Sequence, residues 1–117
     1  MSQKASEAPK VLDPPKSTPF TPAELAKFDG SDPTIPVYVA VKSTVFDVSE
    51  KRNLYGLNGS YHVFAGKDAS KGLGMSSLNL EDAVADYSTL DESQLKVLDD
   101  WYDRFSKQYN IVGKVVS

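Results

Sequence analysis

Two runs of β-branched and aromatic residues near the middle of the chain predict a β-hairpin. The runs are residues 37–41 and 44–48, and only Lys42 and Ser43 separate them. Valine, threonine and phenylalanine favour an extended backbone, and a two-residue connection between such runs is typical of a tight hairpin turn. A third apolar run, residues 111–116, predicts a closing strand.

Two helices are marked by the residues at which they begin. Thr21 and Glu24 have the spacing of a capping box, and Pro22 occupies the first helical position between them. A longer helix is expected to begin after the similar pair of Asp91 and Gln94. Apolar residues then recur three and four positions apart, on one face that we expect to be buried. The residues of this face are Leu95, Leu98, Tyr102, Phe105 and Tyr109.

Residues 1–19 differ from the rest of the chain in composition. They contain four prolines, three lysines and only scattered apolar side chains. Such a segment cannot bury enough apolar surface to offset the entropy that is lost on ordering. We therefore predict a disordered N-terminal tail over residues 1–19 and one folded domain over residues 20–117, a size that allows one core and one ligand pocket.

Composition and charge exclude several kinds of function. The net charge is −3, without the clustered basic excess of a nucleic-acid-binding protein, so no nucleic-acid partner is expected. The chain has no cysteine and one histidine, which excludes disulfides, thiolate metal ligation and a Cys/His zinc site. The longest uninterrupted apolar run is residues 37–41, so we expect no transmembrane segment in this chain.

Glycine and aromatic residues concentrate in residues 54–74. This segment contains five of the seven glycines of the chain, interleaved with Tyr55, Tyr61, His62 and Phe64. Glycine lets the backbone adopt positive φ or come close to another group. Rings with apolar bodies and polar tips in such a loop favour a pocket for a flat, mostly apolar ligand.

The same segment closely resembles the ligand-binding segment of the membrane-associated progesterone receptor family, a branch of the cytochrome b5-like fold. The shared pattern is Tyr-Gly-x-x-Gly-x-Tyr-x-x-Phe-Ala-Gly-x-Asp-Ala-Ser-x-Gly-Leu, which this chain follows from Tyr55 to Leu73. Residues 45–48 and 109–114 also match the strand that precedes this segment in the family and the Tyr-x-x-Val-Gly-Lys ending. The resemblance implies an α+β cytochrome b5-like haem/steroid-binding fold, a small sheet with helices around a haem slot.

In that family the second tyrosine of the pattern is the iron ligand, and Tyr61 occupies this position. The resemblance therefore implies non-covalent binding of ferric haem b through a tyrosinate. A phenolate is a hard anion, which ferric iron stabilises more than ferrous iron does. His62 as the ligand in place of Tyr61 stays open as an alternative. Ligation by two histidines, as in electron-carrying cytochromes b5, is excluded within one chain because His62 is the only histidine.

Further residues are expected around the haem. The resemblance implies that Tyr55 and Tyr109 line the site and bond to haem edges or to Tyr61, with plain core packing as the alternative. Gln108 stands where members of the family often have a lysine, so a propionate contact there is in doubt. The cations available for the haem propionates are Lys51, Arg52, Lys67 and Lys71.

The resemblance implies a protein that has no enzymatic activity of its own and supports cytochrome P450 enzymes of sterol metabolism. Haem with one open face would also allow a haem-mediated homodimer. The expected location is the cytoplasm, including the periphery of the endoplasmic reticulum membrane. The alternative is a haem-independent adaptor or a steroid-binding interaction module of the same fold. Three acidic residues of the long helix predict a solvated face, with a docking patch for a basic partner as the alternative. They are Asp99, Asp100 and Asp103.

Overall fold

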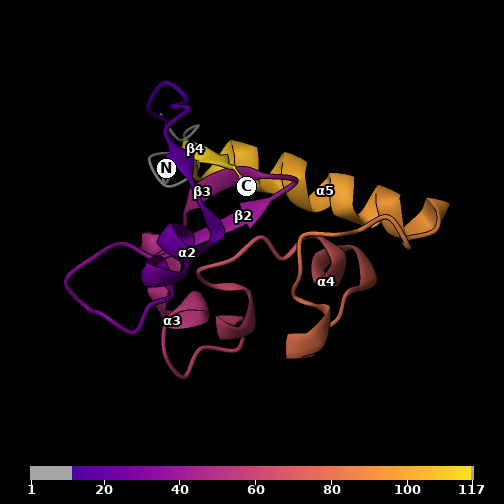
Figure 1. The fold of residues 1–117 in the computed structure, drawn as a ribbon, viewed down its shortest axis with the longest axis horizontal. Coiled ribbons are helices and arrows are strands. Elements are labelled where there is room, and N and C mark those ends of the chain that lie inside the picture. Colours follow the sequence, from indigo (N-terminus) through magenta and orange to yellow (C-terminus); the bar gives the residue numbers. More distant parts are fainter. Residues whose placement is uncertain (1–11, 117) are drawn as a thin grey trace, which may run out of the picture.

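The structure is a computed structural model that describes residues 12–116. Its strands form one mixed sheet in the order β1-β4-β3-β2 (Figure 1). The strands are β1 (Pro19–Phe20), β2 (Tyr38–Val41), β3 (Thr44–Asp47) and β4 (Asn110–Val115). The α-helices are α2 (Pro22–Leu25), α3 (Arg52–Tyr55), α4 (Ser70–Met75) and α5 (Glu92–Gln108). Single 3-10 turns are η1 (Ala26–Phe28), η2 (Ser49–Lys51), η3 (His62–Phe64) and η4 (Leu80–Asp82). The α+β prediction is confirmed.

The predicted hairpin is present as β2 and β3, which pair antiparallel with Val41 opposite Thr44. Lys42 and Ser43 form the turn with φ of 51° and 67°. Positive φ at both central residues is the geometry that lets a two-residue turn follow the twist of the strands. Each strand ends within one residue of its expected bounds.

Both predicted capping boxes are present. Thr21 Oγ1 accepts a hydrogen bond from the Glu24 amide at 3.1 Å, and the Thr21 amide donates to Glu24 Oε1 at 2.9 Å. Asp91 and Gln94 make the same reciprocal pair at the start of α5, at 2.8 and 2.9 Å. These contacts satisfy amides that have no partner inside the helix, and so they fix where α2 and α5 begin.

The sheet has an apolar cluster on each face, because alternate residues of a strand point to opposite sides. On one face, Val39 and Phe46 pack with Phe105 and Leu98 of α5. On the other face, Ala40 and Val45 pack with Leu25 of α2. The stripe predicted for α5 is wrong at its first position: Leu95 is 38% exposed, because the first turns of α5 project past the sheet (Figure 1).

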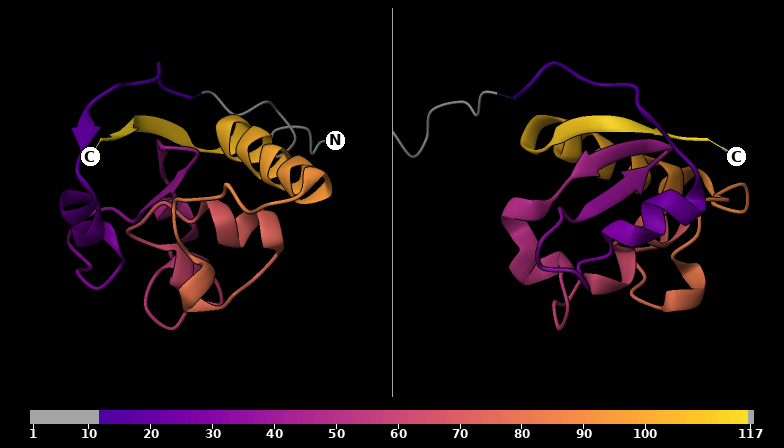
Figure 2. Two further views of the ribbon diagram at one scale, coloured as in Figure 1. Left: turned by 45° about the vertical axis from the view of Figure 1, so that its right-hand side comes forward. Right: turned by 60° about the vertical axis from the view of Figure 1, so that its left-hand side comes forward.

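Part of the segment predicted to be a tail lies along the sheet. β1 pairs parallel with β4, and Phe20 packs edge to face on Tyr38. Before β1, the Lys16 amide donates to the Ile111 carbonyl at 3.0 Å. Figure 2 shows this indigo segment passing beside β4. The sequence does not reveal the pairing with β4, because it joins distant residues through backbone groups. Residues 1–11 lie outside the described residues. Over residues 12–116, no helix has the length and apolar character needed to cross a membrane.

Candidate functional site

A hollow of about 200 Å³ lies between the glycine-rich loop, α4 and α5. Its apolar walls are Phe64 of η3, Leu73 of α4, Trp101 of α5 and Leu78 of the segment after α4. Four further residues complete the lining. These are Tyr61, Gly72, Ser76 and Ser77. A concave surface with mainly apolar walls and few polar groups is typical of a small-molecule site.

Among the residues that line this hollow, Tyr61 is the one with a titratable side chain. Its ring lies 5.7 Å from the Tyr55 ring and 6.0 Å from the Phe64 ring, centroid to centroid. The side chain is half-buried, and its hydroxyl makes no hydrogen bond with any residue in the described part of the chain. A phenol oxygen at an apolar hollow is thus available to a ligand.

The loop before Tyr61 fixes its position through backbone contacts. The Tyr61 amide donates a hydrogen bond of 2.8 Å to the Leu54 carbonyl in α3. Gly59 passes against the same carbonyl, and a Cβ added at Gly59 would lie 2.1 Å from that oxygen. The chain therefore needs glycine here so that the loop can close and present Tyr61.

Behind Tyr61 lies a pair of tyrosines, Tyr55 and Tyr109, both of which are buried. Their hydroxyls form a hydrogen bond in which Tyr55 donates. Burial raises the pKa of Tyr55 far above its ordinary value, and the nearby Tyr109 adds to this. Burial, helped by the charge of Glu50, raises the pKa of Tyr109 to about 12. Both hydroxyls therefore stay protonated at neutral pH, and neither residue lines the hollow.

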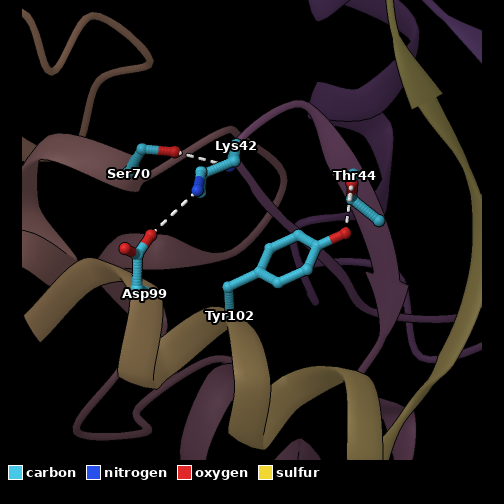
Figure 3. A network of polar contacts seen from close by, with 5 residues as sticks. All are labelled: Lys42, Thr44, Ser70, Asp99 and Tyr102. Atoms are coloured by element: carbon cyan, nitrogen blue, oxygen red, sulfur yellow. Dashed lines mark hydrogen bonds and ion pairs between the residues drawn. The ribbon is translucent and has the colours of Figure 1, made fainter. Parts of the chain in front are cut away.

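A polar network holds the two helices of the hollow against the hairpin turn (Figure 3). Lys42 Nζ lies 2.8 Å from Asp99 Oδ1 on α5, and the Lys42 amide donates to Ser70 Oγ on α4 at 2.7 Å. The hydroxyls of Thr44 and Tyr102 lie 3.3 Å apart. These contacts set the spacing between α4 and α5, which provide Leu73 and Trp101 to the walls.

The comparison with protein families decides the identity of this domain. The family model of the cytochrome b5-like Heme/Steroid binding domain matches residues 21–115. The chain belongs to this family. The predicted resemblance to membrane-associated progesterone receptor proteins, a branch of the fold, is thereby confirmed.

Individual relatives of this cytochrome b5-like domain agree with the assignment. It is 44% identical to "Probable steroid-binding protein 3" of Arabidopsis thaliana, over 84% of this chain and 98% of that protein. It is 37% identical to "Cytochrome P450 regulator dap1" of Schizosaccharomyces pombe, over 97% of this chain and 70% of that protein. A solved structure of a hypothetical Arabidopsis thaliana protein with a cytochrome b5-like fold superposes with a TM-score of 0.79. The two share 42% identity, over 86% of this chain and 93% of that chain.

Other relatives are longer than this cytochrome b5-like domain. The chain spans half or less of the length of the membrane steroid-binding proteins of Arabidopsis thaliana and Oryza sativa that it matches.

The residues of the hollow fit a haem group in their chemistry. Phe64, Leu73 and Trp101 offer apolar contact to a porphyrin, and the phenol of Tyr61 is a side chain of the kind that can bind haem iron. Gly72 helps to keep the hollow open, because a Cβ there would lie 3.4 Å from the Phe64 ring and 3.1 Å from the Asp82 carbonyl. Among the described residues that line the hollow, Tyr61 brings the one phenol, beside the hydroxyls of Ser76 and Ser77.

The cations predicted for the propionates do not line this hollow. The Arg52 guanidinium donates to the Ile35 carbonyl at 2.5 Å, which ties α3 to the preceding loop. Lys51 lies in η2. Hydrogen bonds from Ser88 lower the pKa of Asp86, and the charge of Lys71 on α4 lowers it further, so Lys71 lies near Asp86. Lys67 borders other hollows. Their contacts with haem remain predictions.

His62 also lies outside the Tyr61 hollow. Its Nε2 is 3.0 Å from the Asp29 carbonyl, so the half-buried ring bridges to the loop that follows η1. This contact joins residues 33 positions apart, and no local pattern in the sequence predicts it.

Two residues at this site were missed by the sequence analysis. Trp101 forms a wall of the hollow, and the Arg104 guanidinium lies 4.5 Å from the centre of the Trp101 ring. Neither belongs to the predicted apolar stripe of α5. The available signal is their spacing of three positions, which places two helical side chains next to each other.

Proposed function

We propose that this domain binds ferric haem b non-covalently, with the Tyr61 phenolate as the iron ligand. The observation that supports this most strongly is the Tyr61 hydroxyl, which has no hydrogen-bond partner among the described residues and adjoins an apolar hollow. Bound haem would supply an iron centre that accepts an anionic oxygen. The domain would supply that oxygen and a surface that excludes water from one face.

The aromatic residues around Tyr61 and the nearby cations have different roles in this proposal. Phe64 and Trp101 would contact the porphyrin, since aromatic rings bury large apolar areas. Tyr55 would act as a positioning residue, because its ring packs behind Tyr61 and its hydroxyl is held by Tyr109. Lys51, Arg52 and Lys71 remain candidates for the propionates at the rim, where side-chain rotation could bring a cation closer.

In this proposal the domain supports cytochrome P450 enzymes of sterol metabolism and has no enzymatic activity of its own. The similarity to a protein named as a cytochrome P450 regulator supports this role. Relatives named membrane steroid-binding proteins support a place near a membrane, and we propose the cytoplasmic periphery of the endoplasmic reticulum. An open haem face would also allow two copies to pair through their haems.

Haemin titration of three proteins tests the proposal. The wild type should bind one haemin per chain, and Tyr61→Phe should lose at least about tenfold in affinity, since a charged ligand is replaced by a ring edge. Tyr87→Phe is the matched control, because Tyr87 is half-buried in the same core without lining the hollow. Equal affinities for the wild type and Tyr61→Phe would refute the assignment.

The competing hypothesis is a haem-independent adaptor or a steroid-binding module. The names of relatives such as "Probable steroid-binding protein 3" support this hypothesis. The same titration separates the two, since an adaptor would show no saturable binding of haemin. Steroid binding would instead appear as a steroid-dependent rise in the unfolding temperature that Tyr61→Phe leaves intact.

A further inference from the structure

We infer that Arg104 is a further binding residue of this site, which pairs with a carboxylate of the bound ligand. The inference rests on the proposed function, because it assigns one of the two haem propionates to a side chain of α5. It concerns a residue for which neither the glycine-rich pattern nor the apolar stripe of α5 provides a role.

The first observation is the place of the guanidinium. It lies 4.5 Å from the centre of the Trp101 ring, and Trp101 is a wall of the hollow that Tyr61 lines. Arginine stacked on an aromatic face is held in one plane, which reduces the entropy lost when it binds an anion. Arg104 is thus held against a wall residue of the hollow before any ligand arrives, while it is not itself part of the lining.

The second observation is the place of Arg104 on α5. It directly precedes Phe105, whose ring lies 6.3 Å from the Tyr55 ring. The Tyr55 ring in turn lies 5.7 Å from the Tyr61 ring. Arg104 therefore contacts Trp101, a wall of the hollow, and lies on the part of α5 that packs toward Tyr55 and Tyr61.

The third observation is that few donors of Arg104 have a partner among residues 12–116. Its Nε donates to the Asp100 carbonyl at 3.4 Å, and no carboxylate within the described residues forms an ion pair with it. A guanidinium has five N–H donors in a planar fork that matches a carboxylate. Most of that fork is available to a ligand.

Neighbouring polar residues of α5 are committed elsewhere. Lys107 lies 3.0 Å from Asp103 in an ion pair, and Gln108 borders a different hollow beside Asp47 and Glu50. An apolar hollow cannot hold a propionate without a cationic partner, since an unpaired carboxylate loses its hydration there. Lys96 of α5 borders a separate hollow, so Arg104 is the cation of this helix that contacts a wall residue of the Tyr61 hollow.

The experiment compares two ligands, haemin and its dimethyl ester, in which both propionates are uncharged. Arg104→Gln should bind haemin about three- to tenfold more weakly than the wild type, the range for a partly exposed charge pair. The same variant should bind the ester as well as the wild type does. Lys107→Gln is the matched control and should change neither affinity, while Arg104→Lys should recover part of the loss.

Two outcomes would overturn the inference. Equal losses for haemin and for the ester would show that Arg104 acts only by supporting Trp101. Equal haemin affinity for Arg104→Gln and Lys107→Gln would show no contact at all. Either result is compatible with strong binding by the wild type and a loss in Tyr61→Phe, which would leave the proposed function standing. Failure of the wild type to bind haemin would overturn both.

Discussion

The Tyr61 amide donates a hydrogen bond of 2.8 Å to the Leu54 carbonyl, which joins the candidate ligand residue to the end of α3. This contact closes the loop that contains two glycines, Gly56 and Gly59. It places the phenol beside the hollow without any hydrogen bond from the side chain itself. The backbone therefore positions Tyr61, and its oxygen stays available.

Replacing Gly59 by alanine should displace Tyr61. The added Cβ would lie 2.1 Å from the Leu54 carbonyl oxygen, so the loop must open and the Tyr61 amide must lose its partner. We expect the free energy of unfolding to fall by about 1–3 kcal/mol, the usual cost of forced overpacking. Haemin affinity should fall as well, measured by titration.

Ser60→Ala is the matched control for that change. Ser60 is the next residue of the same loop, and its side chain is exposed. The variant should keep both the stability and the haemin affinity of the wild type. A Gly59→Ala protein with unchanged affinity would contradict the role given to this loop.

The buried tyrosine pair predicts a dependence of stability on alkaline pH. Burial raises the pKa of Tyr109 to about 12, whereas tyrosines of the unfolded chain ionise near 10. The unfolded state therefore loses this proton first, so the contribution of Tyr109 to stability is complete below pH ~10 and is lost as the pH rises toward 12.

Phenolate absorbance measures this directly. Burial raises the pKa of Tyr38, Tyr55 and Tyr109, so these tyrosines should ionise late or only on unfolding, and Tyr109→Phe should remove one late-titrating group. A single transition near pH ~10 for all six tyrosines of the chain, with the fold intact, would contradict the buried pair.

The contacts of β1 predict that the domain needs residues before Thr21. A chain that begins at Thr21 lacks the pairing of Pro19 and Phe20 with β4 and the packing of Phe20 on Tyr38. Its free energy of unfolding should be about 1–3 kcal/mol lower, since one half-buried ring is lost. A chain that begins at Leu12 keeps these contacts and should be more stable in urea unfolding than the chain that begins at Thr21, by that amount. Equal stability of both shortened chains would show that β1 is not needed.

Local signals were enough to predict most of the elements. The reciprocal caps at Thr21 and Asp91 and the hairpin turn at Lys42 depend on residues within three positions of each other, and all three are confirmed. β1 was missed because its pairing with β4 joins residues almost a hundred positions apart through backbone groups. Leu95 was misplaced because periodicity identifies a helix face but does not reveal where the core ends.

The candidate site was only partly predictable for a similar reason. The glycine-rich pattern identified Tyr61 and Phe64, which line the hollow together. The hollow also needs Trp101 from α5, some forty positions later, and its proximity follows from packing between α4 and α5 that no local motif records. Charge alone did not separate Arg52, which bonds to a backbone carbonyl, from Arg104, which lies over Trp101.

Reduction of the iron should weaken haem binding. Ferric iron stabilises the Tyr61 phenolate by its charge, and ferrous iron does so much less. The slot offers no second protein ligand within the described residues, so the loss is not compensated. Haem affinity measured before and after addition of dithionite should fall on reduction. Equal affinity in both states, with a potential like that of two-histidine cytochromes, would contradict tyrosinate ligation.

Tyrosinate ligation is tested most directly by the electron paramagnetic resonance and visible spectra of the ferric complex. Ligation by Tyr61 predicts a high-spin, phenolate-ligated signal in the wild type that disappears in Tyr61→Phe and persists in His62→Ala. His62→Ala serves as the matched variant, since His62 neighbours Tyr61 in sequence but contacts the Asp29 carbonyl outside the hollow. A signal that persists in Tyr61→Phe and disappears in His62→Ala would contradict ligation by Tyr61 and transfer the ligand role to His62.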